Sequence, residues 1–177
     1  YGEQVNLSIV IRTACGAGKS YGPTHSQSFD SWFLSCPGLK VVSPSNAYDA
    51  MGLLRASLKE KGPVLFIEHK MLYSKKFKIP EGKFIVPIGK ASVVKPGRDI
   101  TLITYSNMVE KALNFSNKIK SDVDVEVIDL RTLKPFDKDL IFESVKKTSR
   151  VIILEEGNSC GGIGSELASL IQNECCG

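Results

Sequence analysis

One of the two histidines in the sequence, His25, lies in a polar segment that suits acid–base chemistry. Its neighbours in GPTHSQS (residues 22–28) are glycine, proline, hydroxyls and an amide, and the polar ones are able to fix an imidazole tautomer. Histidine titrates near neutral pH, so it can transfer a proton or hydrogen-bond a carboxylate here. Residue types alone leave a functional and a structural role equally open. The other histidine, His69, ends the apolar segment PVLFIEH and is predicted to be structural.

Two glycine-rich segments resemble anion-binding turns without satisfying the known patterns. CGAGKS (residues 15–20) ends like a phosphate loop, but that pattern requires glycine where Thr13 stands. GGIG (residues 161–164) opens a predicted helix, so its backbone N–H groups could hold an anion. Leu167 occupies the third glycine position of the dinucleotide pattern. A mobile glycine loop is the favoured interpretation of the first segment, and a tight strand-to-helix turn explains the second at least as well as anion binding.

The helix predicted over residues 45–62 ends in RASLKEKG, and its last carbonyl oxygens lack partners inside the helix. Converging carbonyls suit a weakly hydrated monovalent cation such as potassium, although water or a glycine cap serves the same oxygens. The cysteines form no C-x-x-C pair, which argues against a zinc site or a disulfide framework and indicates a reducing compartment. They are Cys15, Cys36, Cys160, Cys175 and Cys176.

The composition is that of a globular protein with a real core: 42% of the 177 residues are hydrophobic and 24% are charged. No apolar run approaches the roughly 18 residues needed to span a bilayer, and the first residues lack the layout of a signal peptide. The net charge of +4 is spread along the chain. Nucleic-acid binding is therefore disfavoured, and the densest basic cluster, SKKFK (residues 74–78), is interpreted as a solvated linker.

Strand and helix patterns alternate in two blocks, which predicts an α/β fold with parallel sheets. In the first block we expect strands over residues 7–12, 39–44 and 63–68. Helices are expected over 28–35, with Phe29, Trp32 and Phe33 on one face, and over 45–62. The second block contains three βα units, with strands over 99–105, 123–131 and 150–156 and helices over 107–119, 137–147 and 163–174. Between the blocks, residues 70–90 are basic, contain Pro and Gly and lack helical periodicity, as in an interdomain linker. Both ends of the sequence fall within these patterns, so a piece of a longer protein is expected.

Seven segments, taken in order, resemble the β subunit of the E1 component of 2-oxo acid dehydrogenase complexes, a family of transketolase-like thiamine diphosphate enzymes. They are VIRTACGAGKSYGPTHSQS, CPGLKVVSPSNAYDAMGLL, GPVLFIEHKMLY, VPIGKA, VIDLRTLKPFD, SVKKTSRVIILEE and GGIGSELA. Within the family, LRTLKPFD, SVKKT and EE followed by GGIG are most similar to the plastid-type pyruvate dehydrogenase subunit.

The resemblance implies a domain division and a set of site residues. Residues 1–72 would be the C-terminal part of the pyrimidine-binding domain, 73–89 a linker, and 90–177 most of the transketolase C-terminal domain, truncated. His25 would line the active-site funnel, where it moves a proton or positions the lipoyl group. The glutamate that bonds the cofactor aminopyrimidine is expected upstream of this sequence. Potassium would be held by the main-chain carbonyls of Ile9, Ser57, Leu58, Glu60 and Gly62.

The same resemblance implies cofactors, partners and an activity. Thiamine diphosphate would be shared with an α subunit that holds the diphosphate and Mg²⁺. The expected partners are that α subunit in an α2β2 heterotetramer with a β–β contact, and the E2 dihydrolipoyl acetyltransferase, with no nucleic acid or membrane. The reaction would be oxidative decarboxylation of pyruvate with acetyl transfer to the lipoyl group of E2, and the isolated segment would be inactive. The alternatives are a branched-chain 2-oxo acid or acetoin dehydrogenase β subunit, and a non-catalytic assembly module. The expected location is an organelle matrix of the plastid or apicoplast type, with the mitochondrial matrix or bacterial cytoplasm as alternatives.

Overall fold

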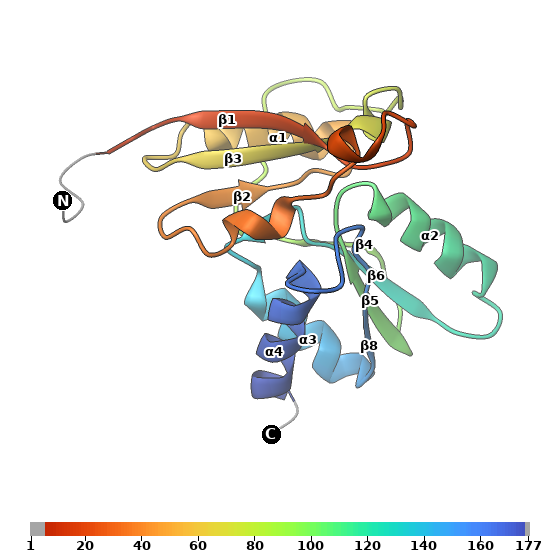
Figure 1. Ribbon diagram of the computed structural model, residues 1–177. Helices are drawn as coiled ribbons and strands as arrows, with labels where there is room; N and C mark the ends of the chain where they lie inside the picture. The colour runs from red at the N-terminus through yellow and green to blue at the C-terminus, as the bar shows by residue number, and fades with distance from the viewer. Residues whose placement is uncertain (1–5, 176–177) are drawn as a thin grey trace.

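The chain folds into two four-stranded sheets, seen in a computed structural model that describes residues 6–175 (Figure 1). The first sheet has the order β1 (Val10–Cys15), β3 (Val64–His69), β2 (Lys40–Val42) and β7 (Thr132–Lys134). Helix α1 (Ala47–Ser57) packs on this sheet. Three single 3-10 turns complete this part: η1 (Pro23–His25), η2 (Asp30–Phe33) and η3 (Lys70–Leu72).

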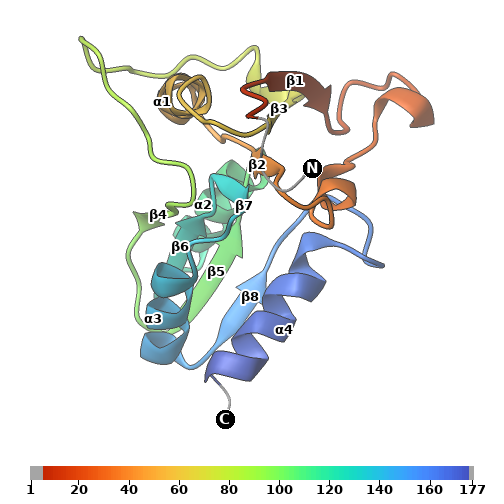
Figure 2. The same ribbon diagram turned by 90° about the vertical axis from the view of Figure 1, so that its left-hand side faces the viewer.

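The second sheet has helices on both faces. Its order is β4 (Ser92–Lys95), β6 (Val125–Asp129), β5 (Ile100–Thr104) and β8 (Val151–Ile153). Helix α2 (Met108–Lys118) covers one face, and α3 (Lys138–Thr148) and α4 (Ile163–Cys175) cover the other (Figure 2). Strand β5 runs parallel to both β6 and β8. The predicted α/β class is therefore confirmed.

Alternation along β2 and β3 explains why these two strands are buried on both faces, whereas the edge strand β1 is largely exposed. Val41, Leu65 and Ile67 point into the main core of the molecule. The intervening Val42 and Phe66 face α1 in a second cluster. A strand that is buried on both sides reads as a continuous apolar run, as VLFI does here.

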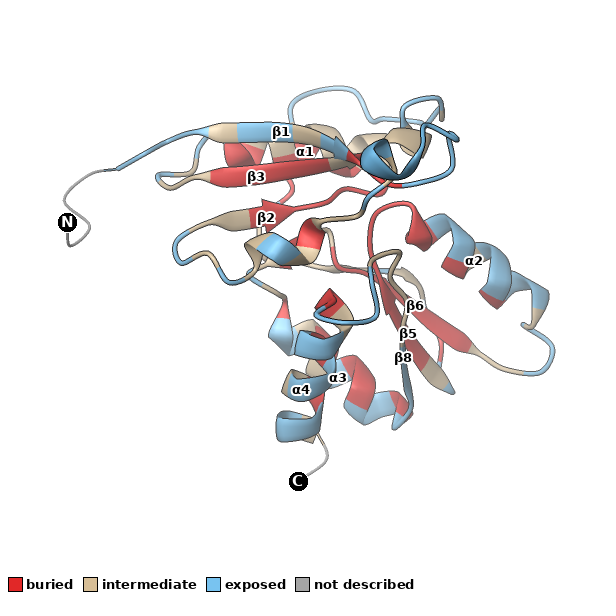
Figure 3. Cartoon of the chain, viewed as in Figure 1, coloured by how far each residue is buried: buried red, intermediate tan, exposed pale blue. Residues whose placement is uncertain are grey.

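The two sheets share one hydrophobic core. Leu65 of the first sheet and Ile103 and Ile128 of the second are fully or almost fully buried in the same cluster. Leu133 joins it from β7, which lies within the second block in sequence, directly after β6, but pairs antiparallel with β2 of the first sheet. Figure 3 shows the buried residues continuing through the junction between the sheets. The two blocks are thus packed as a unit, and the sequence-based domain boundaries stay a prediction.

Three details of the secondary structure differ from the sequence expectations. The helix predicted over residues 28–35 was wrong: only η2 forms, Phe29 and Phe33 pack against the core, and Trp32 is 64% exposed. A helix this short does not recover its nucleation cost. Strands β4 and β7 were missed, and each lies antiparallel at a sheet edge. Residues 73–91 contain neither helix nor strand.

The predicted helix over residues 45–62 is shorter than expected. Asn46 caps its start, because the Asn46 side chain accepts a hydrogen bond from the Asp49 N–H at 2.8 Å. It ends at Ser57, and the N–H groups of Lys59 and Glu60 then bond three residues back in 3-10 fashion. Nowhere in residues 6–175 is there a helix long and apolar enough to cross a bilayer.

Candidate functional site

His25 stands on an open loop at the carboxyl end of β1. The loop, residues 16–27, is closed at its base by a hydrogen bond of 3.0 Å from the Gly16 N–H to the Gln27 carbonyl. Gly16 has φ +90°, a left-handed conformation that favours glycine, and starts the turn away from the sheet. His25 is exposed, in the single turn η1. The glycine and proline of the segment therefore build a loop that presents the imidazole at the surface.

The side of this loop forms a cavity of about 490 Å³. Its lining residues are Ala14, Tyr21, Thr24, His25, Gln27, Phe29 and Lys70. Lys70 donates a hydrogen bond to the His25 carbonyl, and its ammonium lies 5.8 Å from the centre of the Tyr21 ring. Within residues 6–175 the His25 imidazole itself has no hydrogen-bond partner, so neither ring nitrogen is engaged. A ligand entering this cavity meets a free imidazole beside an ammonium group.

The second histidine, His69, lies behind the loop and is 3% exposed. Its Nε2 is 2.9 Å from Oε2 of Glu156, and its Nδ1 accepts the Met71 N–H at 3.2 Å. Burial lowers the pKa of His69 and outweighs the attraction of the Glu156 carboxylate. Burial raises the pKa of Glu156, but the Ala17 N–H and His69 outweigh it, so that this pKa lies below its ordinary value. At neutral pH the contact joins a neutral imidazole to a carboxylate.

A second acidic group, Asp30, lies in the same buried region. It is 3% exposed, and its Oδ1 finds no partner among the described residues. Burial, together with the nearby Glu156 and Glu155 carboxylates, raises the pKa of Asp30 to about 6. Residue types alone did not single out Glu156 or Asp30, because their proximity depends on how the two blocks pack.

The glycine-rich segments are both occupied by carboxylates of the chain itself. The Ala17 N–H of CGAGKS donates to Glu156 at 2.7 Å. At GGIG, Glu155 accepts the Ile163 and Gly164 N–H groups, both at 2.9 Å, which caps α4. A Cβ on Gly162 would fall 2.4 Å from Glu155 Oε1, so this glycine makes room for the carboxylate. The N–H groups of GGIG do hold an anion, but it is an internal one.

The carbonyls expected to hold potassium lie on two neighbouring segments. The Ile9 carbonyl accepts the Val64 N–H at 2.9 Å, which places the start of β1 beside the segment that follows α1. The Ser57 carbonyl accepts the Glu60 N–H at 3.2 Å. In the described part of the chain, no backbone N–H reaches the carbonyls of Leu58, Glu60 and Gly62. These three oxygens are left without a backbone donor, whereas the first two are shared, and the potassium site stays a prediction.

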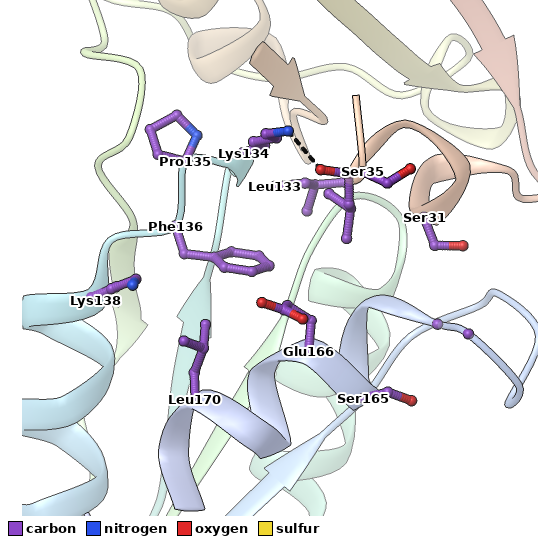
Figure 4. A pocket seen from close by; sticks show the side chains of 13 residues that line it. Ser31, Ser35, Leu133, Lys134, Pro135, Phe136, Lys138, Ser165, Glu166 and Leu170 are labelled. Carbon is purple, nitrogen blue, oxygen red and sulfur yellow. Dashed lines mark hydrogen bonds between the residues drawn. The ribbon is translucent and has the colours of Figure 1, made fainter. Parts of the chain in front are cut away.

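Another cavity, of about 500 Å³, lies between η2, the start of α3 and the start of α4 (Figure 4). Phe136, Leu170 and Glu166 extend toward it. On its wall Lys134 Nζ donates to the carbonyls of Leu34 and Cys36, at 2.6 and 2.7 Å. It shares no lining residue with the His25 cavity. The Lys134 ammonium therefore holds the chain after η2 in place beside this cavity.

Metal and disulfide chemistry find no support among residues 6–175. That part of the chain holds no group of three His, Cys, Asp or Glu residues arranged to bind a metal ion. Its four cysteines, Cys15, Cys36, Cys160 and Cys175, are free thiols. Cys176 lies outside the described residues.

Comparisons with known proteins match both halves of the chain to one family. The family described as "Transketolase, pyrimidine binding domain" matches residues 2–76, and "Transketolase, C-terminal domain" matches residues 89–177. Among solved structures, "Split gene transketolase, inactive beta4 tetramer" superposes with a TM-score of 0.82 at 24% identity. It covers 96% of this chain and 55% of that one. At that identity the likeness shows the fold.

Curated relatives are more similar in sequence. The "Pyruvate dehydrogenase E1 component subunit beta" of Rickettsia felis is 41% identical over 98% of this chain and 53% of the relative. That of Cyanidium caldarium is 44% identical over 96% of this chain and 52% of the relative. The mitochondrial beta-1 subunit of Arabidopsis thaliana is 40% identical over 97% and 48%. The chain thus spans about half the length of the curated relatives it matches. It belongs to the transketolase-like family and is a homologue of the pyruvate dehydrogenase E1 beta subunits.

Proposed function

We propose that this chain is part of the β subunit of a pyruvate dehydrogenase E1 component, which decarboxylates pyruvate and transfers the acetyl unit to a lipoyl group of E2. The observation that carries the proposal is the placement of His25. Its imidazole is exposed and unengaged on the wall of a cavity, beside the Lys70 ammonium. The sequence relatives are named as subunits of pyruvate dehydrogenase, and in that class of reaction an imidazole can serve as an acid or a base.

The transketolase-like family depends in general on thiamine diphosphate, which when bound supplies the carbanion that attacks the 2-oxo acid. The described residues do not fit the diphosphate. In CGAGKS the Ala17 N–H is already bonded to Glu156, and in GGIG the Ile163 and Gly164 N–H groups are bonded to Glu155. This occupation supports a diphosphate and Mg²⁺ held by a partner α subunit, with this chain lining the approach to the reacting atoms.

His25 is proposed to act in the steps that involve the lipoyl group. An imidazolium can donate a proton to the sulfur that is released when the lipoyl disulfide opens, and it can hydrogen-bond a developing negative charge, whereas a neutral imidazole can take up a proton. The Lys70 ammonium donates a hydrogen bond to the His25 carbonyl. It thereby holds the loop and adds positive charge to the cavity.

The α subunit is the proposed partner of the exposed aromatic surface around Trp32, in an α2β2 heterotetramer with a β–β contact, and E2 is the proposed acceptor complex. The main-chain carbonyls of residues 9 and 57–62 are proposed as a potassium site. The relatives come from a bacterium, an alga and a mitochondrion. A plastid-type location therefore stays a proposal.

The substrate is tested with the full-length β subunit co-expressed with its cognate α subunit. Thiamine-dependent decarboxylation is measured with an artificial electron acceptor, comparing pyruvate with 2-oxoisovalerate. We expect a kcat/KM at least tenfold higher for pyruvate. Preference for 2-oxoisovalerate would assign the chain to a branched-chain enzyme. Absence of turnover with either, in a correctly assembled heterotetramer, would favour the assembly role.

A further inference from the structure

The loop that carries His25 is fastened by a single carboxylate from the other block. Glu156 follows β8, 139 residues from Ala17 in sequence. Its Oε1 accepts the Ala17 N–H at 2.7 Å and lies 3.4 Å from the Ser28 hydroxyl. Ala17 and Ser28 are at the two ends of the loop. One oxygen atom therefore holds the entry and the exit of the segment that presents His25.

The second oxygen of Glu156 ties the loop to the end of β3. Because Nδ1 of His69 accepts the Met71 N–H, the ring proton is on Nε2, which donates to Oε2 at 2.9 Å. The next residue, Lys70, donates to the His25 carbonyl. Glu156 thus orients His69, and the residue after His69 holds the backbone of His25.

The fit between the loop and His69 leaves no free space. A Cβ on Gly16 would lie 2.0 Å from Nε2 of His69. The loop backbone at Gly16 therefore packs directly against the His69 ring. The loop, through the Ala17 N–H, and the ring both donate a hydrogen bond to the Glu156 carboxylate. If the hydrogen bond from the Ala17 N–H to Glu156 is broken, no other hydrogen bond among residues 6–175 fixes the distance between the start of the loop and the second block.

We propose that Glu156 is a positioning residue, which fixes the His25 loop through the Ala17 N–H, the Ser28 hydroxyl and His69. The inference rests on the proposed function for its catalytic consequence. Three donors converge on this carboxylate, and a glutamine offers only one acceptor oxygen and turns its NH₂ group toward a donor. Misplacing a reacting group by about 1 Å can cost on the order of 10²-fold in rate.

The first test measures the loop itself, by hydrogen exchange of the peptide covering residues 16–28 in the full-length α2β2 protein. Glu156→Gln should speed exchange of the Ala17 amide by about 10- to 100-fold, the range for a lost hydrogen bond to a charged group. Glu143→Gln on α3 is the matched control, with an exposed side chain and the same change of charge. Unchanged exchange in Glu156→Gln would overturn the proposal. If that variant does not assemble, Glu156→Asp, which keeps the charge but shortens the side chain by one methylene, must show the same deprotection.

The second test separates positioning from general stability. In Glu156→Gln we expect kcat for acetyl transfer to a lipoyl domain to fall at least tenfold. Decarboxylation with an artificial acceptor should stay within about twofold, and adding His25→Ala should cost little more, since the two changes act on one unit. Equal losses in both reactions, or fully multiplicative losses in the double variant, would overturn positioning. A wild-type protein inactive on pyruvate would refute the proposed function, while the exchange result would still decide the role of Glu156.

Discussion

Replacing the buried Asp129 by asparagine should change how the stability of the protein depends on pH. Asp129 ends β6, is fully buried, and accepts the Ser45 hydroxyl at 2.5 Å and the Arg131 N–H at 3.0 Å. The guanidinium of Arg131 lies 2.9 Å from a different carboxylate, that of Asp49. Two carboxylates thus share one cation. Burial raises the pKa of Asp129 from 3.8 to about 7.

The size of the effect follows from this displacement of the pKa. At about 1.4 kcal/mol per pH unit, it corresponds to about 4 kcal/mol. Because the folded-state pKa is raised, the contribution to stability is complete below about pH 3.8 and is lost as pH rises through about 7. Asparagine cannot ionise. Between pH 5 and pH 8 the free energy of unfolding of the wild type should therefore fall by roughly 2.5 kcal/mol relative to that of Asp129→Asn.

The assay is urea unfolding of the full-length β subunit at several pH values, for the wild type and Asp129→Asn. Any hydrogen bond that asparagine gains or loses shifts all points equally, so the slope against pH isolates the charge. Asp139→Asn, an exposed aspartate on α3, provides the baseline to subtract. A corrected difference that stays constant from pH 5 to pH 8 would refute the reasoning, since Asp129 would then be equally ionised in the folded and unfolded states.

Three further expectations concern packing, capping and ion binding. Leu133→Ala should lower the free energy of unfolding by about 3 kcal/mol, because it opens a cavity in the core shared by both sheets. The control is Leu7, whose side chain is 59% exposed: Leu7→Ala should lower the free energy of unfolding by less than about 0.5 kcal/mol in the same urea assay. Gly162→Ala should cost about 1–2 kcal/mol, because the new Cβ must displace Glu155 from the start of α4; Gly157→Ala, whose Cβ would have ordinary contact distances, is the control in thermal unfolding. If residues 57–62 hold potassium, replacing K⁺ by Na⁺ should lower the Tm of the full-length protein, and equal Tm values in both salts would exclude the site.

Much of the fold was predictable because local patterns and packing agree. VLFI, ITLIT and VEVID are apolar or β-rich runs of strand length, and each became a central strand of its sheet. The start of the helix predicted over residues 45–62 agrees with α1, which Asn46 caps. The failures occurred where tertiary contacts outweighed local preference. Thr132–Lys134 carries too little pattern to read as a strand, and forms β7 only because β2 offers an edge.

The candidate site was predictable only in part, for a similar reason. His25 could be singled out from its polar neighbours and the family resemblance, and its exposed loop agrees with that expectation. Glu156 could not be singled out, because its partners Ala17 and His69 are far away in sequence. One signal was present: the adjacent glutamates of EE, followed by GGIG, serve two different glycine-rich turns, one each.

The most direct test of the proposed function is acetyl transfer from pyruvate to a lipoyl domain by the full-length α2β2 protein carrying His25→Ala. We expect transfer to fall by about 10²- to 10⁴-fold, the range for a lost proton-transfer group. Thiamine-dependent decarboxylation with an artificial acceptor should remain largely intact. Undiminished acetyl transfer in His25→Ala would contradict the assignment and leave the exposed imidazole without a catalytic role.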